Sequence, residues 1–233
     1  FQKNLNYLIS YPHGCIEQIT SVAFPQLFLG NVMELSEFRR KEIEANVKAC
    51  LNKIKSYQLS GGGFAYWPSV SDKISEWGTN YAGHFMLEAE AQGYELPVGL
   101  LDPWVNYQTS QANNWQHKSN NYSSDLTQAY RIYTLALAKK PVLSAMNRMR
   151  ETPGIHNAAK WRLAAAYALA GKTDIGSEII RGLNTSATGN ADYWETYGSQ
   201  ERDKAMMLET MVLLRNYAQA LPLVEEISNI LSS

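Results

Sequence analysis

Apolar residues recur at every third or fourth position along most of the chain, which is the spacing of one face of an α-helix. One such face runs from about residue 36 to 57 and carries Ile43, Val47, Cys50, Leu51 and Ile54. Similar faces lie within 82–93, 126–137, 161–169, 207–214 and 221–231. Shorter helices are predicted over 15–29, 97–113, 140–150 and 173–183. For the helix over 126–137, we expect Asp125 or Ser124 as the N-cap.

The predicted fold class is all-α, because the alternation of apolar and polar residues that is typical of strands is nearly absent. Short breakers such as GGGF, GYELP, KKP, TPG and AGKTD separate the helices, and short connections between helices make antiparallel hairpins. About six such hairpins would build either a helical solenoid or a closed α/α toroid. No repeat of fixed length is evident, which favours the toroid. We expect one domain over residues 1–233.

Composition and charge mainly exclude partners. Hydrophobic residues make up 45% and charged residues 18% of the chain, which is ordinary for a folded protein. The net charge of −1 gives no reason to expect a nucleic acid or an anionic membrane as a partner. No apolar run is long enough to span a bilayer. The chain opens FQKNLNYLIS, with neither an initiator Met nor a cleavage site, and we interpret it as a domain excised from a longer multidomain chain.

The chain has two cysteines, at positions 15 and 50. Cys50 lies on an apolar helical face and is interpreted as a buried structural thiol. Cys15 lies in YPHGCIEQITS, residues 11–21, just where a helix is predicted to begin. Three alternatives are open for it: a metal ligand, a structural thiol, either free or in a disulfide with Cys50, and a nucleophile. A metal site needs three or four ligands, and no second Cys/His pair lies at ligand spacing.

The nucleophile hypothesis rests on the i,i+3 spacing of Cys15 and Gln18, which makes them neighbours on one helical face. Attack of the thiolate on the side-chain amide would expel ammonia and leave an internal thioester. Such a bond hydrolyses in water, so it needs an apolar, aromatic cover. Two stretches rich in glycine and aromatic residues, 61–85 and 182–205, are candidates for that cover.

The segment HGCIEQ resembles the Gly-Cys-x-Glu-Gln thioester motif of the alpha-2-macroglobulin and complement family, and the form YP-GCIEQ is similar to its bacterial branch. Four further segments are similar to successive landmarks of the family's thioester-containing domain, so the resemblance spans about residues 1–233. They are GGFAYWP, EWGTNYAGHFMLEAEAQGYELP, DLTQAYRIYTLALA and YGSQERDKAMMLETMVLL. The resemblance implies an α/α toroid of about six hairpins.

The resemblance also implies a function, that of a protease-trapping inhibitor. A protease cuts a bait region elsewhere in the long chain, and the exposed thioester then acylates a lysine amine of that protease. This is single-turnover acyl transfer by an endopeptidase inhibitor, not turnover by an enzyme. The implied partners are target proteases and other domains of the same chain, with no cofactor and no metal. The implied location is periplasmic or extracellular.

Each site residue follows from the match to the motif or from the need for cover. Cys15 supplies the thioester sulfur, Gln18 the acyl group, and Glu17 an electrostatic or orienting contribution. Gly14 allows a tight backbone approach ahead of the helix. Candidates for the cover are Tyr66, Trp67, Trp77 and Tyr81.

This sequence differs from the family pattern at one position of the motif and lacks a clear match to a second catalytic residue, and two alternative functions stay open. Ile16 stands where animal relatives have glycine, and its β-branched side chain stiffens the turn. His117 is the one histidine near the position where some complement proteins carry a catalytic histidine. We interpret it as a solvated loop residue and therefore expect a preference for amines over hydroxyls.

Two other functions are alternatives to protease trapping. One is a glycoside hydrolase, whose carboxylates would be Glu76 together with Asp192 and Glu195 beside Trp194. The other is a non-reactive interaction scaffold.

Overall fold

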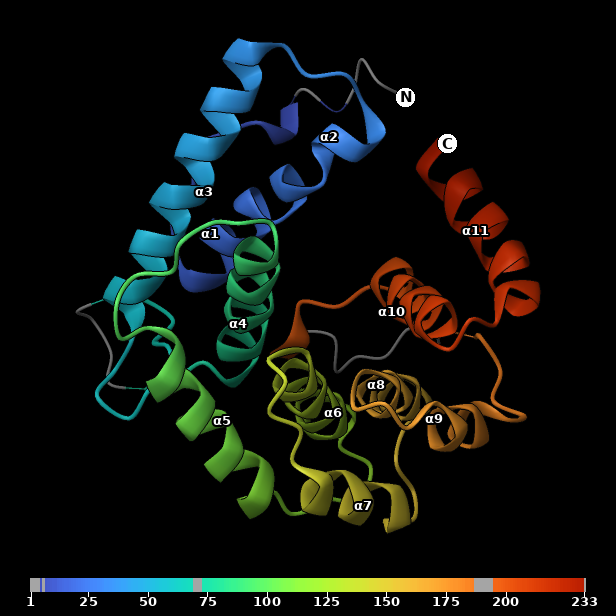
Figure 1. Ribbon diagram of the computed structural model, residues 1–233. Coiled ribbons are helices and arrows are strands. Elements are labelled where there is room, and N and C mark those ends of the chain that lie inside the picture. Colours follow the sequence, from blue (N-terminus) through green and yellow to red (C-terminus); the bar gives the residue numbers. More distant parts are fainter. Residues whose placement is uncertain (1–4, 6, 69–72, 187–194, 233) are drawn as a thin grey trace. The chain divides into compact units, whose positions relative to one another are not determined.

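The computed structural model describes residues 5, 7–68, 73–186 and 195–232, and within these the chain is all-α, as predicted (Figure 1). The described residues contain no β-ladder, only the isolated bridges Gln58–Phe64 and Ala65–Ile74. The chain divides into two compact units, Phe1–Tyr107 and Gln108–Ser233. Each unit is described by itself, and the single domain remains a prediction.

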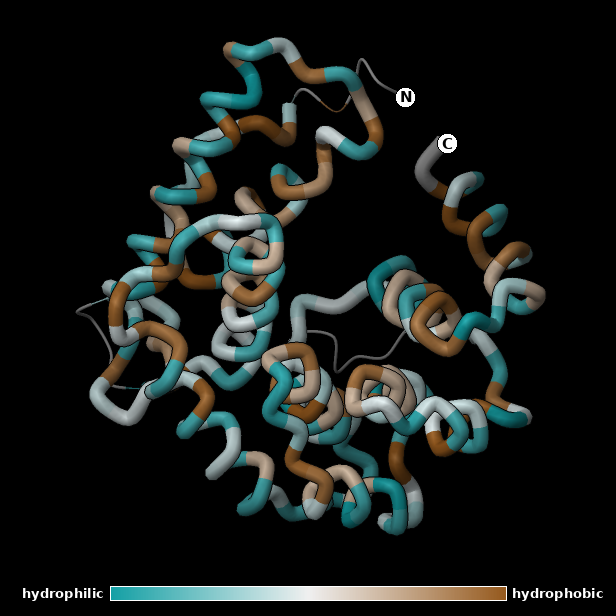
Figure 2. Tube along the Cα trace, in the orientation of Figure 1, coloured by the Kyte–Doolittle hydropathy of each residue, from teal (hydrophilic) through white to brown (hydrophobic). Residues whose placement is uncertain are grey.

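The first unit contains the helices that hold the cysteines. Its elements are α1 (Ile16–Ala23), a 3₁₀ turn (Pro25–Leu27), α2 (Leu29–Val32), α3 (Glu37–Tyr57), α4 (Glu76–Ala91) and the start of α5 (Leu101–Asn114). The short helix α1 packs against both α3 and α4. Apolar and polar residues alternate in bands along α3, as expected for a helix with one buried face (Figure 2).

The second unit is organised around one alanine-rich helix. It contains α6 (Tyr122–Leu137), α7 (Leu143–Glu151), α8 (Asn157–Leu169), α9 (Thr173–Ile180), α10 (Gln200–Leu213) and α11 (Tyr217–Ser232). Helix α8 packs against α6, α9 and α10. Its alanines at 158, 159, 164, 165 and 166 are buried, and their small side chains let the neighbouring helices approach closely. Among the described residues, no helix is both long and apolar enough to cross a membrane.

Several predicted element boundaries differ from the observed ones by a few residues, and two of the differences have a clear local cause. The helix predicted over 15–29 is interrupted after Ala23, because Pro25 begins a 3₁₀ turn instead of continuing α1. Helix α6 is capped by Asn121 and not by Asp125 or Ser124, since the Asn121 side chain accepts a hydrogen bond from Ser124 N at 2.8 Å. Asp125 is instead fully buried in the first part of α6.

We expect Gly83→Ala to destabilise the protein by about 1–3 kcal/mol through overpacking. A Cβ at Gly83 in α4 would lie 2.2 Å from Trp104 Cζ2. The Trp104 ring cannot retreat easily, because it is fully buried and its Nε1 donates to Thr79 O at 2.9 Å. This cost exceeds the gain of about 0.5–1 kcal/mol that alanine has over glycine in a helix.

Urea unfolding monitored by circular dichroism measures the change in the free energy of unfolding. Gly30→Ala in α2 is the matched control, because the nearest atom to its new Cβ is Leu35 Cδ1 at 3.6 Å, an ordinary contact. We expect this control to be neutral or slightly stabilising. Equal stabilities of the two variants would show that the Gly83–Trp104 contact is not tightly packed.

Candidate functional site

Cys15 is the N-cap residue of α1 and is buried, with an exposed fraction of 1%. Its backbone is extended, at φ −69° and ψ 171°, while Gly14 before it has φ +104°. A residue outside the helix also contacts its first turn: Tyr66 O accepts a hydrogen bond from Ile16 N at 3.1 Å. Ile16 and Ile19 are fully buried, so the first turn of α1 is anchored on its apolar face.

The structure brings Cys15 and Gln18 together, as their spacing predicts. Cys15 N donates a hydrogen bond to Gln18 Oε1 at 3.0 Å, so the carboxamide folds back over the start of its own helix. Gly14 makes this possible, because a Cβ at that position would lie 2.1 Å from the same oxygen. The result is a thiol-bearing residue whose own backbone N–H polarises the carbonyl that the thiol would attack.

Helix α3 fixes the turn that leads into Cys15 at two points. Lys53 Nζ donates to Pro12 O at 2.7 Å and lies 4.6 Å from the centre of the Tyr11 ring. One helical turn later, the Tyr57 hydroxyl donates to Gly14 O. Sequence reasoning identified neither contact; the one signal for Tyr57 was that it continues the apolar face of α3 beyond Ile54.

Glu17 lies between Cys15 and Gln18 in the sequence and is half-buried. Its Oε1 accepts a hydrogen bond from Ser21 Oγ at 2.8 Å, one turn further along α1. This contact fixes the carboxylate on the flank of α1. The orienting contribution of Glu17 remains a prediction.

The four residues predicted to cover the thioester lie in different settings. The backbone of Tyr66 contacts the start of α1 through Ile16, whereas Trp67 is 42% exposed. Trp77 is buried in the first turn of α4. The Tyr81 ring lies 5.6 Å from the ring of Phe24, the residue that caps the end of α1, and burial raises the pKa of Tyr81. Tyr66, through its backbone, and Tyr81, through its ring, thus contact the helix bearing Cys15.

Cys50 is the structural thiol that the sequence predicts. It is fully buried on α3, and its Sγ contacts Ile19 O at 3.3 Å, which ties α3 to α1. Burial raises the pKa of the Cys50 thiol far above its ordinary value, so it stays protonated and unreactive. Both cysteines are free thiols in the structure, so the alternative of a Cys15–Cys50 disulfide is not what is observed.

His117 is not simply solvated, contrary to the expectation for a loop residue. Its Nδ1 lies 3.1 Å from Oδ1 of the buried Asp125, and His156 Nδ1 lies 2.8 Å from Oδ2 of the same carboxylate. These two contacts are contained within the second unit. One buried carboxylate therefore holds two imidazoles at the N-termini of α6 and α8.

The carboxylates of the hydrolase alternative are only partly described. Glu76 is exposed at the start of α4, and its Oε1 accepts a hydrogen bond from the Tyr107 hydroxyl at 2.6 Å. Asp192 and Trp194 lie outside the described residues, and Glu195 adjoins them. Nothing in the described contacts of Glu76 points to a second carboxylate.

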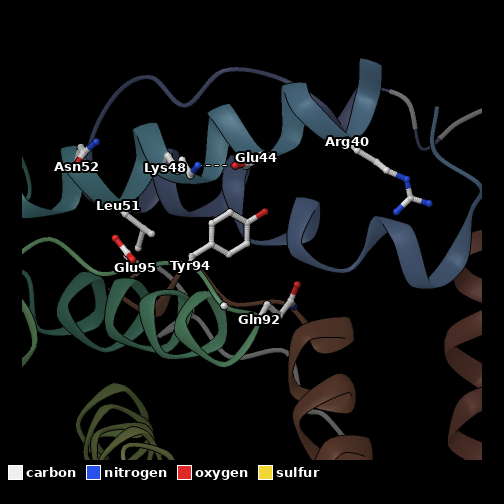
Figure 3. Close-up of a pocket in the computed structure, with 9 residues that line it drawn as sticks. Arg40, Glu44, Lys48, Leu51, Asn52, Gln92, Tyr94 and Glu95 are labelled. Carbon is white, nitrogen blue, oxygen red and sulfur yellow. Dashed lines mark hydrogen bonds and ion pairs between the residues drawn. The ribbon is translucent and has the colours of Figure 1, made fainter. Parts of the chain in front are cut away.

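A cavity of about 730 Å³ lies between α3 and the end of α4 (Figure 3). Tyr94 points into it toward the ion pair of Lys48 and Glu44, and Arg40 and Glu95 are also at its wall. None of the predicted site residues lines this cavity. It is therefore a feature separate from the surroundings of Cys15.

Comparison with known proteins shows that this chain is similar to one domain of the alpha-2-macroglobulins. A family model described as the A-macroglobulin TED domain matches residues 1–121. The alpha-2-macroglobulin of Escherichia coli K12 is 27% identical over 222 residues, covering 88% of this chain and 13% of that protein.

Solved structures give the same relationship at the level of the fold. Native Escherichia coli alpha-2-macroglobulin superposes with a TM-score of 0.77 at 23% identity, covering 97% of this chain and 15% of the other. Salmonella alpha-2-macroglobulin reacted with methylamine gives 0.75 at 25% identity, with 94% and 16% covered. These likenesses confirm the predicted fold class, the α/α toroid.

Proposed function

We propose, on the premise that the chain belongs to the A-macroglobulin TED domain family, that Cys15 and Gln18 form an internal thioester. The hydrogen bond of 3.0 Å from Cys15 N to Gln18 Oε1 carries the proposal. It holds the carboxamide against the residue that bears the thiol, so the acyl group is positioned before any bond forms. Cys15 is buried, whereas Gln18, whose Cδ water would attack, is exposed, so the thioester depends on a cover over Gln18.

The chemistry consists of two acyl transfers. In the first, Cys15 Sγ adds to Gln18 Cδ, the Cδ–Nε2 bond breaks, and ammonia leaves with the thiol proton. In the second, an amine adds to the same Cδ, the Sγ–Cδ bond breaks, and Cys15 leaves as a free thiol. The acyl group is then consumed in a stable amide, so each molecule reacts once.

The biological role that fits this chemistry is protease trapping within a longer protein. The chain spans 13% of the length of the Escherichia coli relative, which supports the interpretation that other domains of the same protein accompany it. Cleavage of a bait region in one of those domains would expose the thioester to a lysine amine of the attacking protease. The protein is then an endopeptidase inhibitor of the bacterial periplasm or exterior, and it prefers amines to hydroxyls.

The residues around α1 would extend the life of the thioester. Glu17 is fixed by Ser21 on the flank of the helix, and Tyr66 and Tyr81 approach it from the neighbouring segments. Trp67 and Trp77 complete the proposed cover, with the exposed Trp67 available to an adjoining domain. Removing Tyr81 by Tyr81→Ala would then speed the hydrolysis of the thioester.

Protease capture tests this function directly. We expect the full-length protein, mixed with trypsin, to form an adduct that survives boiling in detergent, because the new bond is an amide. Pretreatment with methylamine should prevent the adduct by consuming the acyl group first. An adduct that forms equally well after complete reaction with methylamine would contradict the proposal.

A further inference from the structure

One peptide group connects Tyr57 with Gln18. The carbonyl oxygen of Gly14 accepts a hydrogen bond from the Tyr57 hydroxyl. The N–H of the same peptide, which belongs to Cys15, donates to Gln18 Oε1 at 3.0 Å. The three groups therefore form a continuous chain of hydrogen bonds that runs from a phenol, through a peptide, to the carbonyl that would become the thioester.

Such a chain has an electronic consequence. A donor on the carbonyl oxygen of a peptide withdraws electron density from its nitrogen and makes its N–H a stronger donor; this mutual polarisation strengthens a bond by about 10–30%. We propose that Tyr57 is a positioning residue for the thioester chemistry, which it assists by polarising the Gly14–Cys15 peptide as an oxyanion-stabilising donor to Gln18 Oε1. This inference rests on the function proposed above.

The proposed contribution applies to both acyl transfers. When Cys15 Sγ or an amine adds to Gln18 Cδ, the π electrons of the carbonyl move to Oε1, which becomes negative. Cys15 N lies 3.0 Å from this oxygen in the unreacted side chain, so a donor is already in place beside the atom on which the negative charge develops. As the tetrahedral intermediate collapses, the carbonyl reforms and the leaving group departs, so the peptide N–H is neither gained nor lost.

The surroundings of Tyr57 keep its hydroxyl protonated and fixed against the Gly14 carbonyl. It is the last residue of α3 and is 5% exposed, and its own carbonyl accepts a hydrogen bond from Ala65 N at 2.9 Å. Burial raises the pKa of Tyr57, and a negative charge on Cys15 would raise it further, so the hydroxyl keeps the proton that it donates. The contact between Cys50 and Ile19 fixes α3 relative to α1.

The test compares Tyr57→Phe with Tyr107→Phe in the full-length protein. Both remove one hydroxyl that donates a hydrogen bond in the first unit, but the Tyr107 hydroxyl contacts Glu76 and not the Gly14–Cys15 peptide. The readout is the second-order rate constant for thiol release by methylamine, which does not depend on how much thioester has formed. Direct loss of an oxyanion donor lowers the rate constant of a reaction by about 100- to 1,000-fold. Because Tyr57 adds about 10–30% to the strength of that donor, the indirect effect of Tyr57→Phe should be about 2- to 8-fold, and Tyr107→Phe should leave the rate unchanged.

A graded substitution separates polarisation from mere support. Replacing Tyr57 by 3-fluorotyrosine keeps its shape but makes the hydroxyl a stronger donor, so the rate constant should rise above that of the wild type. This arm also serves if Tyr57→Phe fails to fold or to form the thioester. A rate that is the same for tyrosine and fluorotyrosine would overturn the inference, as would a Tyr57→Phe rate within twofold of the wild type. A wild-type protein that releases no thiol would instead overturn the proposed function, and this inference with it.

Discussion

Cys15→Ala should abolish both the release of a thiol by methylamine and the covalent capture of trypsin. Without Sγ, no bond to Gln18 Cδ can form, and the side-chain amide is too unreactive to acylate an amine on its own. The expected effect is complete loss of the covalent adduct, not a reduced rate. Intact-mass spectrometry of the full-length variant, with thiol titration before and after methylamine, measures both signals.

Cys50→Ala is the matched control for this prediction. It also removes one of the two cysteines, but Cys50 is a buried thiol on α3 whose Sγ contacts the backbone carbonyl of Ile19 in α1. We expect this variant to lose some stability, because a small cavity replaces the sulfur, and to keep its reaction with methylamine. If Cys50→Ala lost the reaction while Cys15→Ala kept it, the assignment of the thioester sulfur would be wrong.

Gly14→Ala should reduce the yield of thioester by about 100-fold or more, because misplacing a reacting group by about 1 Å can cost this much. A Cβ at this position would lie 2.1 Å from Gln18 Oε1 and 2.9 Å from Gln18 Cδ. The carboxamide must move, and its hydrogen bond to Cys15 N is lost with it. The backbone φ of +104° adds a cost of about 1–2 kcal/mol for an L-residue.

Gly93→Ala separates the backbone cost from the clash. Gly93 has φ +91°, close to that of Gly14, but a Cβ there would meet no atom within 4 Å. Both variants should therefore lose stability in urea unfolding, whereas only Gly14→Ala should lose the mass signature of the thioester. Equal thioester yields in the two variants would contradict the proposed use of Gly14.

The sequence sufficed for the fold wherever one long helical face was buried. The helix predicted over 36–57 is observed as Glu37–Tyr57, because its apolar positions and the Ser36 cap agree. Around residues 121–125, by contrast, several polar side chains could each cap α6. The choice depends on His156, 31 residues further along the chain, whose N–H and ring hold the Asp125 carboxylate. Local sequence carries no signal for such a contact.

The proximity of Cys15 and Gln18 was predictable, but the contacts that support their turn were not. Cys15 and Gln18 are three positions apart, so helix geometry alone brings them together. Lys53 and Tyr57 contact the same turn from 41 and 43 positions away, and these contacts depend on how α3 packs against α1. The family resemblance supplied the hypothesis of thioester chemistry, whereas the hydrogen bonds from α3 emerge only from the folded chain.

The central claim, that Cys15 and Gln18 are joined in an internal thioester, is tested most directly by the intact mass of the native full-length protein before and after methylamine. The account predicts a native mass lower than that of the sequence by one ammonia, and after treatment a mass raised by one methylamine together with one new free thiol. A native mass equal to that of the sequence, unchanged by methylamine and without a new thiol, would contradict it.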